Sequence, residues 1–120
     1  MKAVRYRSYG DSGVLVYGDA DRPVAGAGQV VVKVAGAAFN PVDVAIRAGF
    51  TPGPEAPGRG VRTARVFARS DAAQLAGLVA RVDAGDLTID VAQRRPLADL
   101  PAVHDQAAAG QLPGKTILTP

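Results

Sequence analysis

The sequence predicts a mixed α+β domain with a mostly antiparallel sheet. Three observations support this fold class. Strand-like segments fill most of the first 40 residues, glycine-rich turn clusters separate them, and helical patterns begin only after residue 40. The chain has 120 residues, enough for one domain that buries roughly two-thirds of the surface exposed by its unfolded form. We therefore expect a single domain.

The strand predictions begin with a β-meander. The segments "MKAVRYR" and "VLVY" are rich in β-forming residues, and "QVVVKVAGAAF" (residues 29–39) is the strongest strand signal. The clusters "YGDSG" and "GDADRPVAGAG" indicate turns between these segments. Three later strands are expected in "VRTARVFA", "LTIDVA" and "KTIL", at residues 61–68, 87–92 and 115–118.

A short helix is predicted at residues 41–48. Asn40 is a favourable capping residue, Pro41 suits the first helical position, and Asp43 places an acid in the first turn. Gly49 ends the helix. A helix N-terminus therefore has a structural use for Asn40 and Asp43, whatever else they do.

Two further helices are predicted, near residues 71–84 and 100–109. Ser70 caps the first and Gly85 ends it. Its apolar face follows from four residues at helical spacing: Leu75, Leu78, Val79 and Val82. The second of the two helices ends at Gly110.

Composition argues against several classes of function. The chain has no cysteine and one histidine, so neither a disulfide nor a zinc centre is expected. The net charge is +3, but basic residues are spread along the chain and aromatics are few, which gives little support for nucleic-acid binding.

No apolar run approaches the roughly 18 residues that a membrane helix needs, and the N-terminus lacks the apolar region of a secretory signal. A cytoplasmic location is therefore expected.

Two short motifs resemble nucleotide-binding sequences but lack the required context. Gly26 and Gly28 form a G-x-G, yet a phosphate-binding glycine turn opens a helix, whereas this one leads into a predicted strand with Val31 at the third glycine position. The "GK" of "LPGKTIL" lacks the spaced first glycine and the following helix of a phosphate loop. Turns explain both motifs better.

Four segments carry a family resemblance: "MKAVRYRSYGDSGVL", "GQVVVKVAGAAFNPVDVAIRAG", "AQLAGLVARVDAGDL" and "PLADLPAVHDQAAAGQLPGKTIL". Residues 1–50 and 61–120 resemble the two ends of a medium-chain dehydrogenase/reductase of the zeta-crystallin-like quinone oxidoreductase and enoyl reductase type. That family has a GroES-like catalytic domain built from both chain ends and a central Rossmann domain that binds NADPH. The resemblance implies one GroES-like partial β-barrel over 1–120, joined at the Pro/Gly-rich seam "FTPGPEAPGRG" (50–60).

The sequence departs from this family at its centre. The Rossmann domain is missing, so NADPH-dependent reduction has no hydride source and no cofactor is expected. In zinc-dependent relatives a cysteine ligand stands where this chain has Asn40, so the resemblance is to the metal-free branch. Part of the barrel is missing too, which leaves strand edges that a second copy could pair with. A homo-oligomer, such as a dimer, is therefore expected.

The resemblance also implies site residues. It places Asn40 and Asp43 at the mouth of the substrate cleft as candidate catalytic residues, with Arg47 nearby for substrate binding. His104 is the only side chain that ordinarily titrates near neutral pH, but its place in the family's C-terminal helix pattern favours a structural role. Aromatic side chains are candidates either for the substrate pocket or for the core: Tyr6, Tyr9 and Phe50.

Three hypotheses of function follow. The first is a non-redox, small-molecule-binding remnant of a reductase that acts without a cofactor, as a cyclase, isomerase or lyase on a polyketide-like or enone substrate of natural product biosynthesis. The second is a non-catalytic binding or regulatory module. The third is a catalytically dead deletion product of an NADPH-dependent reductase.

Overall fold

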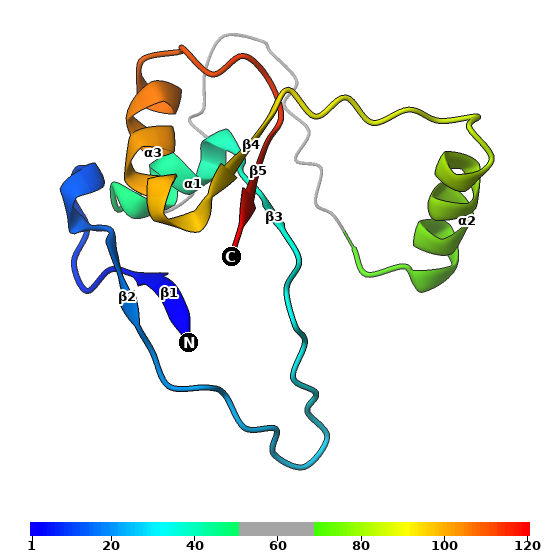
Figure 1. Ribbon diagram of the computed structural model, residues 1–120, viewed down its shortest axis with the longest axis horizontal. Helices are drawn as coiled ribbons and strands as arrows, with labels where there is room; N and C mark the ends of the chain where they lie inside the picture. Colours follow the sequence, from blue (N-terminus) through cyan, green and yellow to red (C-terminus); the bar gives the residue numbers. More distant parts are fainter. Residues whose placement is uncertain (51–68) are drawn as a thin grey trace, which may run out of the picture. The chain divides into compact units, whose positions relative to one another are not determined.

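The computed structural model describes residues 1–50 and 69–120 (Figure 1). The chain divides into two compact units. Unit 1 comprises Met1–Thr51 and Val91–Pro120, and unit 2 comprises Pro52–Asp90. The described residues form three α-helices and two small sheets, which confirms the α+β class. The strand predicted at 61–68 and all of the seam except Phe50 lie outside the described residues, so the joining of two chain ends there stays a prediction.

The first sheet of unit 1 is the antiparallel pair β1 (Lys2–Arg5) and β2 (Val16–Asp19). A short 3-10 helix, η1 (Ser12–Val14), lies between the two strands in sequence. Asp11 caps η1, since its carboxylate accepts a hydrogen bond from the backbone N–H of Gly13 at 2.9 Å. The N-terminal part of the expected meander is thus confirmed.

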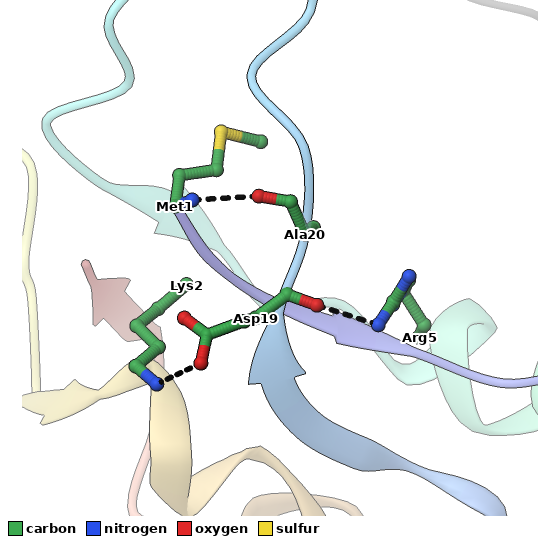
Figure 2. A network of polar contacts seen from close by, with 5 residues as sticks. All are labelled: Met1, Lys2, Arg5, Asp19 and Ala20. Carbon is green, nitrogen blue, oxygen red and sulfur yellow. Dashed lines mark hydrogen bonds and ion pairs between the residues drawn. The ribbon is translucent and has the colours of Figure 1, made fainter.

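A polar network joins the open end of this hairpin (Figure 2). The amino group of Met1 donates to the carbonyl of Ala20 at 2.6 Å, and Nζ of Lys2 lies 2.9 Å from the carboxylate of Asp19. Arg5 donates to the backbone carbonyl of Asp19 at 2.6 Å. These groups are exposed, so the network helps to define the register of the strands more than it stabilises the fold.

The second sheet brings together segments from both ends of the chain. Its order is β3 (Ala37–Ala38), β5 (Thr116–Thr119), β4 (Gln93–Pro96). β5 pairs antiparallel with β3 and parallel with β4. The central strand has an alternating pattern, with Thr116 and Leu118 buried. The sequence predicts a short final strand at residues 115–118, and β5 confirms it with a shift of one residue.

Helices α1 (Pro41–Arg47) and α3 (Leu100–Ala108) pack in unit 1, with the 3-10 helix η2 (Leu97–Asp99) immediately before α3. Both α-helices lie where they were predicted. The small core is centred on three buried side chains, around which partly buried apolar residues gather: Phe39, Val103 and Leu118, then Val44, Leu97, Leu100, Ala107 and Leu112. A core this small gives unit 1 modest apolar burial.

Unit 2 contains the described helix α2 (Ala72–Asp83), which confirms the prediction at 71–84. Its N-cap is Asp71 rather than Ser70, because the Asp71 carboxylate accepts from the backbone N–H of Gln74 at 2.9 Å. Gly85 ends the helix with φ +80°. The predicted apolar face is present but exposed, with Leu75 at 62%. None of the helices in the described parts of the chain is long and apolar enough to cross a membrane.

Two strand predictions are wrong in extent. The strand expected at 29–39 contracts to Ala37–Ala38, and the one expected at 87–92 is displaced to Gln93–Pro96. A strand requires a hydrogen-bonded neighbour: β5 supplies one at both observed positions, whereas no described segment pairs with residues 29–34. The described residues form no closed barrel, and a GroES-like partial barrel is not confirmed.

Candidate functional site

A cavity of about 300 Å³ lies within unit 1. Its wall is mostly apolar and comes from β1, β3, β5, α1, η2 and α3. Four of the lining residues have polar side chains: Tyr6, Asp43, Arg47 and His104. An apolar pocket with a few converging polar groups is the usual form of a small-molecule site.

Arg47 and His104 form a buried polar pair on this wall. They are 7% and 4% exposed, and Nε of Arg47 donates a hydrogen bond to Nδ1 of His104 at 3.2 Å. Nη1 of Arg47 donates to the backbone carbonyl of Gly10, whose own N–H donates to the Arg47 carbonyl at 3.2 Å. Arg47 therefore joins α1, α3 and the loop before η1.

The environment of His104 favours its neutral form. The ring of Phe39 meets the imidazole edge to face, with centroids 5.0 Å apart. Burial is the main cause that lowers the pKa of His104 below 6.5, and the charge of Arg47 lowers it further, while Asp43 and Asp105 act in the opposite direction. A lowered pKa leaves the imidazole predominantly uncharged at pH 7.

The N-terminus of α1 orients Asp43. Its carboxylate accepts a hydrogen bond from the backbone N–H of Asn40 at 2.7 Å. The side-chain oxygen of Asn40 accepts from Nζ of Lys115 at 2.7 Å, and the same ammonium donates to the carbonyl of Phe39 at 3.3 Å. Asn40 thus links the helix N-terminus to the C-terminal strand region, while Asp43 lines the cavity.

Three of the residues predicted from the sequence line this cavity: Tyr6, Asp43 and Arg47. The other three do not. Asn40 is exposed and bonded to Lys115, and Phe50 is also exposed. Tyr9 packs beside Tyr6, with ring centroids 6.3 Å apart. These positions are compatible with the predicted roles of the first three, and the roles themselves stay predictions.

His104 also lines the cavity, although the sequence favours a structural role for it. Its burial and its bond to Arg47 are compatible with that role. The structural expectation rests on its place in the family's C-terminal helix pattern, and no partner for it is evident nearby in the sequence. Its partner Arg47 lies 57 residues away. The available signal was composition, since an isolated histidine beside a predicted site is a natural candidate for acid–base chemistry.

The site does not suit zinc. The chain has no cysteine, and Nδ1 of its one histidine is occupied by the hydrogen bond from Arg47. In residues 1–50 and 69–120, no three His, Cys, Asp or Glu side chains lie close enough together to hold a metal ion. A protein zinc site needs three or four such ligands.

The glycine motif does not suit a pyrophosphate. Residues 26–29 form a turn in which the N–H of Gln29 donates to the Gly26 carbonyl at 3.1 Å. The side-chain oxygen of Gln29 already accepts from the N–H of Gly26 at 3.1 Å. The residues after this turn have no regular secondary structure and form no helix, so the free N–H groups of a helix N-terminus are not available here.

Comparison with known families identifies a relationship. The family described as zinc-binding dehydrogenase matches residues 8–118. This range includes the three described α-helices, the strands β2, β3 and β4, and all of β5 except its last residue. No curated protein and no solved structure matches the chain. The match spans nearly the whole chain and agrees with the resemblance noted in the sequence. The chain therefore belongs to the zinc-binding dehydrogenase family, within the medium-chain dehydrogenase/reductases.

Proposed function

We propose that this chain binds a small carbonyl compound and acts on it without a nucleotide or metal, as an isomerase, cyclase or lyase. The observation that supports this proposal is the cavity of unit 1, whose apolar wall carries a carboxylate, a guanidinium, an imidazole and a phenol. A polyketide-like or enone compound matches this wall. Its carbon skeleton contacts the apolar side chains, and its oxygen accepts hydrogen bonds.

The proposed chemistry is proton transfer at the carbon next to a carbonyl. Such a reaction needs a base at the carbon and hydrogen-bond donors at the oxygen, which becomes negative as the proton leaves. Asp43 supplies the carboxylate, and Tyr6 is available as a donor. Asn40 acts as a positioning residue, because its backbone N–H holds one carboxylate oxygen of Asp43. Protonated Asp43 then returns the proton to a different carbon of the substrate, which completes an isomerisation.

We further propose that unit 1 is an open remnant of a GroES-like barrel. Support comes from β5, the last strand of the chain, which pairs with β3 from the N-terminal half and with β4 from the C-terminal half. Both ends of the chain thus contribute to one sheet, as the family architecture implies for its catalytic domain. An experimental structure checks this proposal, and a sheet whose strand order differs from β3-β5-β4 would contradict it.

The proposal is tested by binding. Titration with NADPH, followed by its fluorescence, is expected to show no saturable signal. Titration with 2-cyclohexen-1-one or 1,4-naphthoquinone, followed by ¹H–¹⁵N spectra, is expected to shift the resonances of cavity residues selectively. A saturable NADPH signal in the micromolar range, or an absence of selective shifts with both probes, would count against the proposed function.

Catalysis is tested at Asp43. The exchange of deuterium from D₂O into the position next to the ketone of 2-cyclohexen-1-one reports proton removal. Asp43→Asn keeps an oxygen for the Asn40 N–H but removes the base, so the exchange rate is expected to fall about 100-fold or more. Asp86→Asn, an exposed carboxylate of unit 2, is the matched control and is expected to exchange at the wild-type rate.

A second candidate function, a self-associating binding module, is favoured by the exposed valines after the Gly26–Gln29 turn. Val30 is 84% exposed, and Val31, Val32 and Val34 are exposed as well. If two copies of this segment paired antiparallel about Val32, Val30 would stand opposite Val34 on one face. Light scattering is expected to show a dimer that Val32→Lys converts to a monomer. A monomeric wild-type protein at micromolar concentration excludes this candidate.

A further inference from the structure

The direction of the Arg47–His104 hydrogen bond determines the tautomer of the histidine. A guanidinium is always protonated in proteins and has donors only, so Nδ1 of His104 must be the acceptor. A neutral imidazole carries one proton, which therefore resides on Nε2. The two nitrogens of the ring thus have different roles, Nδ1 inside the pair and Nε2 as a hydrogen-bond donor.

The surroundings keep the imidazole neutral as well as oriented. The ring is 4% exposed and packs against the ring of Phe39 in a T-shaped arrangement. Among the charged groups that influence it, Arg47 opposes protonation, whereas the carboxylates of Asp43 and Asp105 favour it. Burial adds to the effect of Arg47, and the pKa of His104 is lowered as a result. Near pH 7, the ring is then a donor at Nε2 with no lone pair free to act as a base.

We propose that Arg47 is a positioning residue that fixes His104 as the Nε2–H tautomer, so that the cavity offers a neutral donor to the oxygen of a ketone, enone or quinone. This inference rests on the proposed function and deepens it by assigning the two acid–base groups of the cavity. His104 binds the carbonyl oxygen, and Asp43 is left as the base. A neutral donor can stabilise the negative charge that develops on an enolate oxygen through a hydrogen bond while keeping its own proton.

The tautomer is directly measurable, because the chain has a single histidine. Long-range ¹H–¹⁵N correlation spectra of the ligand-free protein at pH 7 are expected to show a protonated Nε2 and an unprotonated Nδ1. A protonated Nδ1, or a doubly protonated ring, overturns the inference. This measurement uses the wild-type chain and is therefore independent of how any variant folds.

The role of Arg47 is tested by two substitutions with a control. Arg47→Leu removes the donor, and the ring is expected to become a mixture of both neutral tautomers. Arg47→Gln retains an N–H donor without the charge and is expected to restore much of the Nε2–H form. Arg94→Leu, an exposed arginine of β4, is expected to leave the tautomer unchanged. If neither Arg47 substitution alters the tautomer in folded protein, the inference is wrong.

The ligand assignment is tested with 2-cyclohexen-1-one as the probe. Saturating enone is expected to shift the Nε2 resonance. Arg47→Leu leaves only part of the rings as the Nε2–H tautomer and is therefore expected to weaken binding about twofold. If the enone binds saturably but the Nε2 resonance does not shift, this inference is contradicted while the proposed function is not. If His104 is the Nε2–H tautomer but the protein does not bind 2-cyclohexen-1-one, both the ligand assignment and the proposed function are contradicted.

Discussion

Helices α3 and α2 are both amphipathic, and they differ in what covers their apolar sides. Val103 of α3 is fully buried in the core with Phe39 and Leu118. Leu75 of α2 is 62% exposed, although four apolar residues at helical spacing predict an apolar face for this helix. Helical spacing indicates which side of a helix is apolar, but only neighbouring elements remove that side from water.

The same contrast holds between two segments that the sequence predicts as strands. β5 lies between two strands, and its Leu118 is buried. Residues 29–34 have the stronger β-forming composition, yet they pair with no described strand and their valines are exposed. β-propensity reflects a fit to a partly buried sheet surface, so it has no effect without a partner.

The largest expected effect compares two leucine truncations. Leu118→Ala removes a buried side chain from the central strand and is expected to lower the free energy of unfolding by about 3 kcal/mol. Leu75→Ala on α2 is expected to change it by less than about 0.5 kcal/mol. Urea unfolding followed by circular dichroism measures both. A loss of about 2 kcal/mol or more for Leu75→Ala would show that the apolar side of α2 is covered in solution.

An intermediate effect compares the glycines that end α1 and α2. Gly49 and Gly85 have φ +89° and +80°, so alanine is strained at both positions. A Cβ atom at Gly49 would also lie 3.2 Å from Cγ of Tyr9, whereas the space around Gly85 is open. Gly49→Ala is therefore expected to cost about 2 kcal/mol and Gly85→Ala about 1 kcal/mol. Thermal unfolding of both variants provides the test, and an equal cost would contradict the role given to Tyr9.

The smallest expected effect concerns pH and the buried pair of unit 1. The pKa of His104 is lower in the folded chain than the usual 6.5, so the unfolded chain takes up the proton first as pH falls. The free energy of unfolding is thus expected to decline as pH falls from about 6.5 through the folded pKa. Melting temperatures at pH 7, 6 and 5 measure this decline.

His104→Gln is the control for that titration, because it lacks a group that ionises in this range. Its melting temperature is expected to vary less between pH 7 and 5 than that of the wild type. A wild-type protein that becomes more stable on acidification over this range would contradict the assigned direction of the pKa shift.

Local features were predictable because neighbouring residues determine them. Asn40, Pro41 and Gly49 predicted the bounds of α1, and the structure confirms them to within one residue. The cap of α2 was misplaced by one position, since Ser70 and Asp71 are both good capping residues and only the observed hydrogen bond to Gln74 distinguishes them.

The site was predictable in part. Asp43 and Arg47 come from one helix, and their spacing already places both on the same side of it. Tyr6 lies on a distant segment and was a candidate either for the pocket or for the core, whereas nothing in the sequence indicated that His104 shares a cavity with that helix. The family resemblance identified the region, while the partner of each polar group required coordinates.

The sequence by itself determined the order of helices, the polar ends of α1, the absence of thiolate ligands and the family of the chain. These depend on residue type and short-range spacing, which the chain carries in any conformation. Only the tertiary structure decided which strands pair, which apolar sides are buried, and that Arg47 donates to His104 across 57 residues. Those outcomes depend on whether distant segments meet, and each hydrogen bond or buried contact exists only when its partner is present.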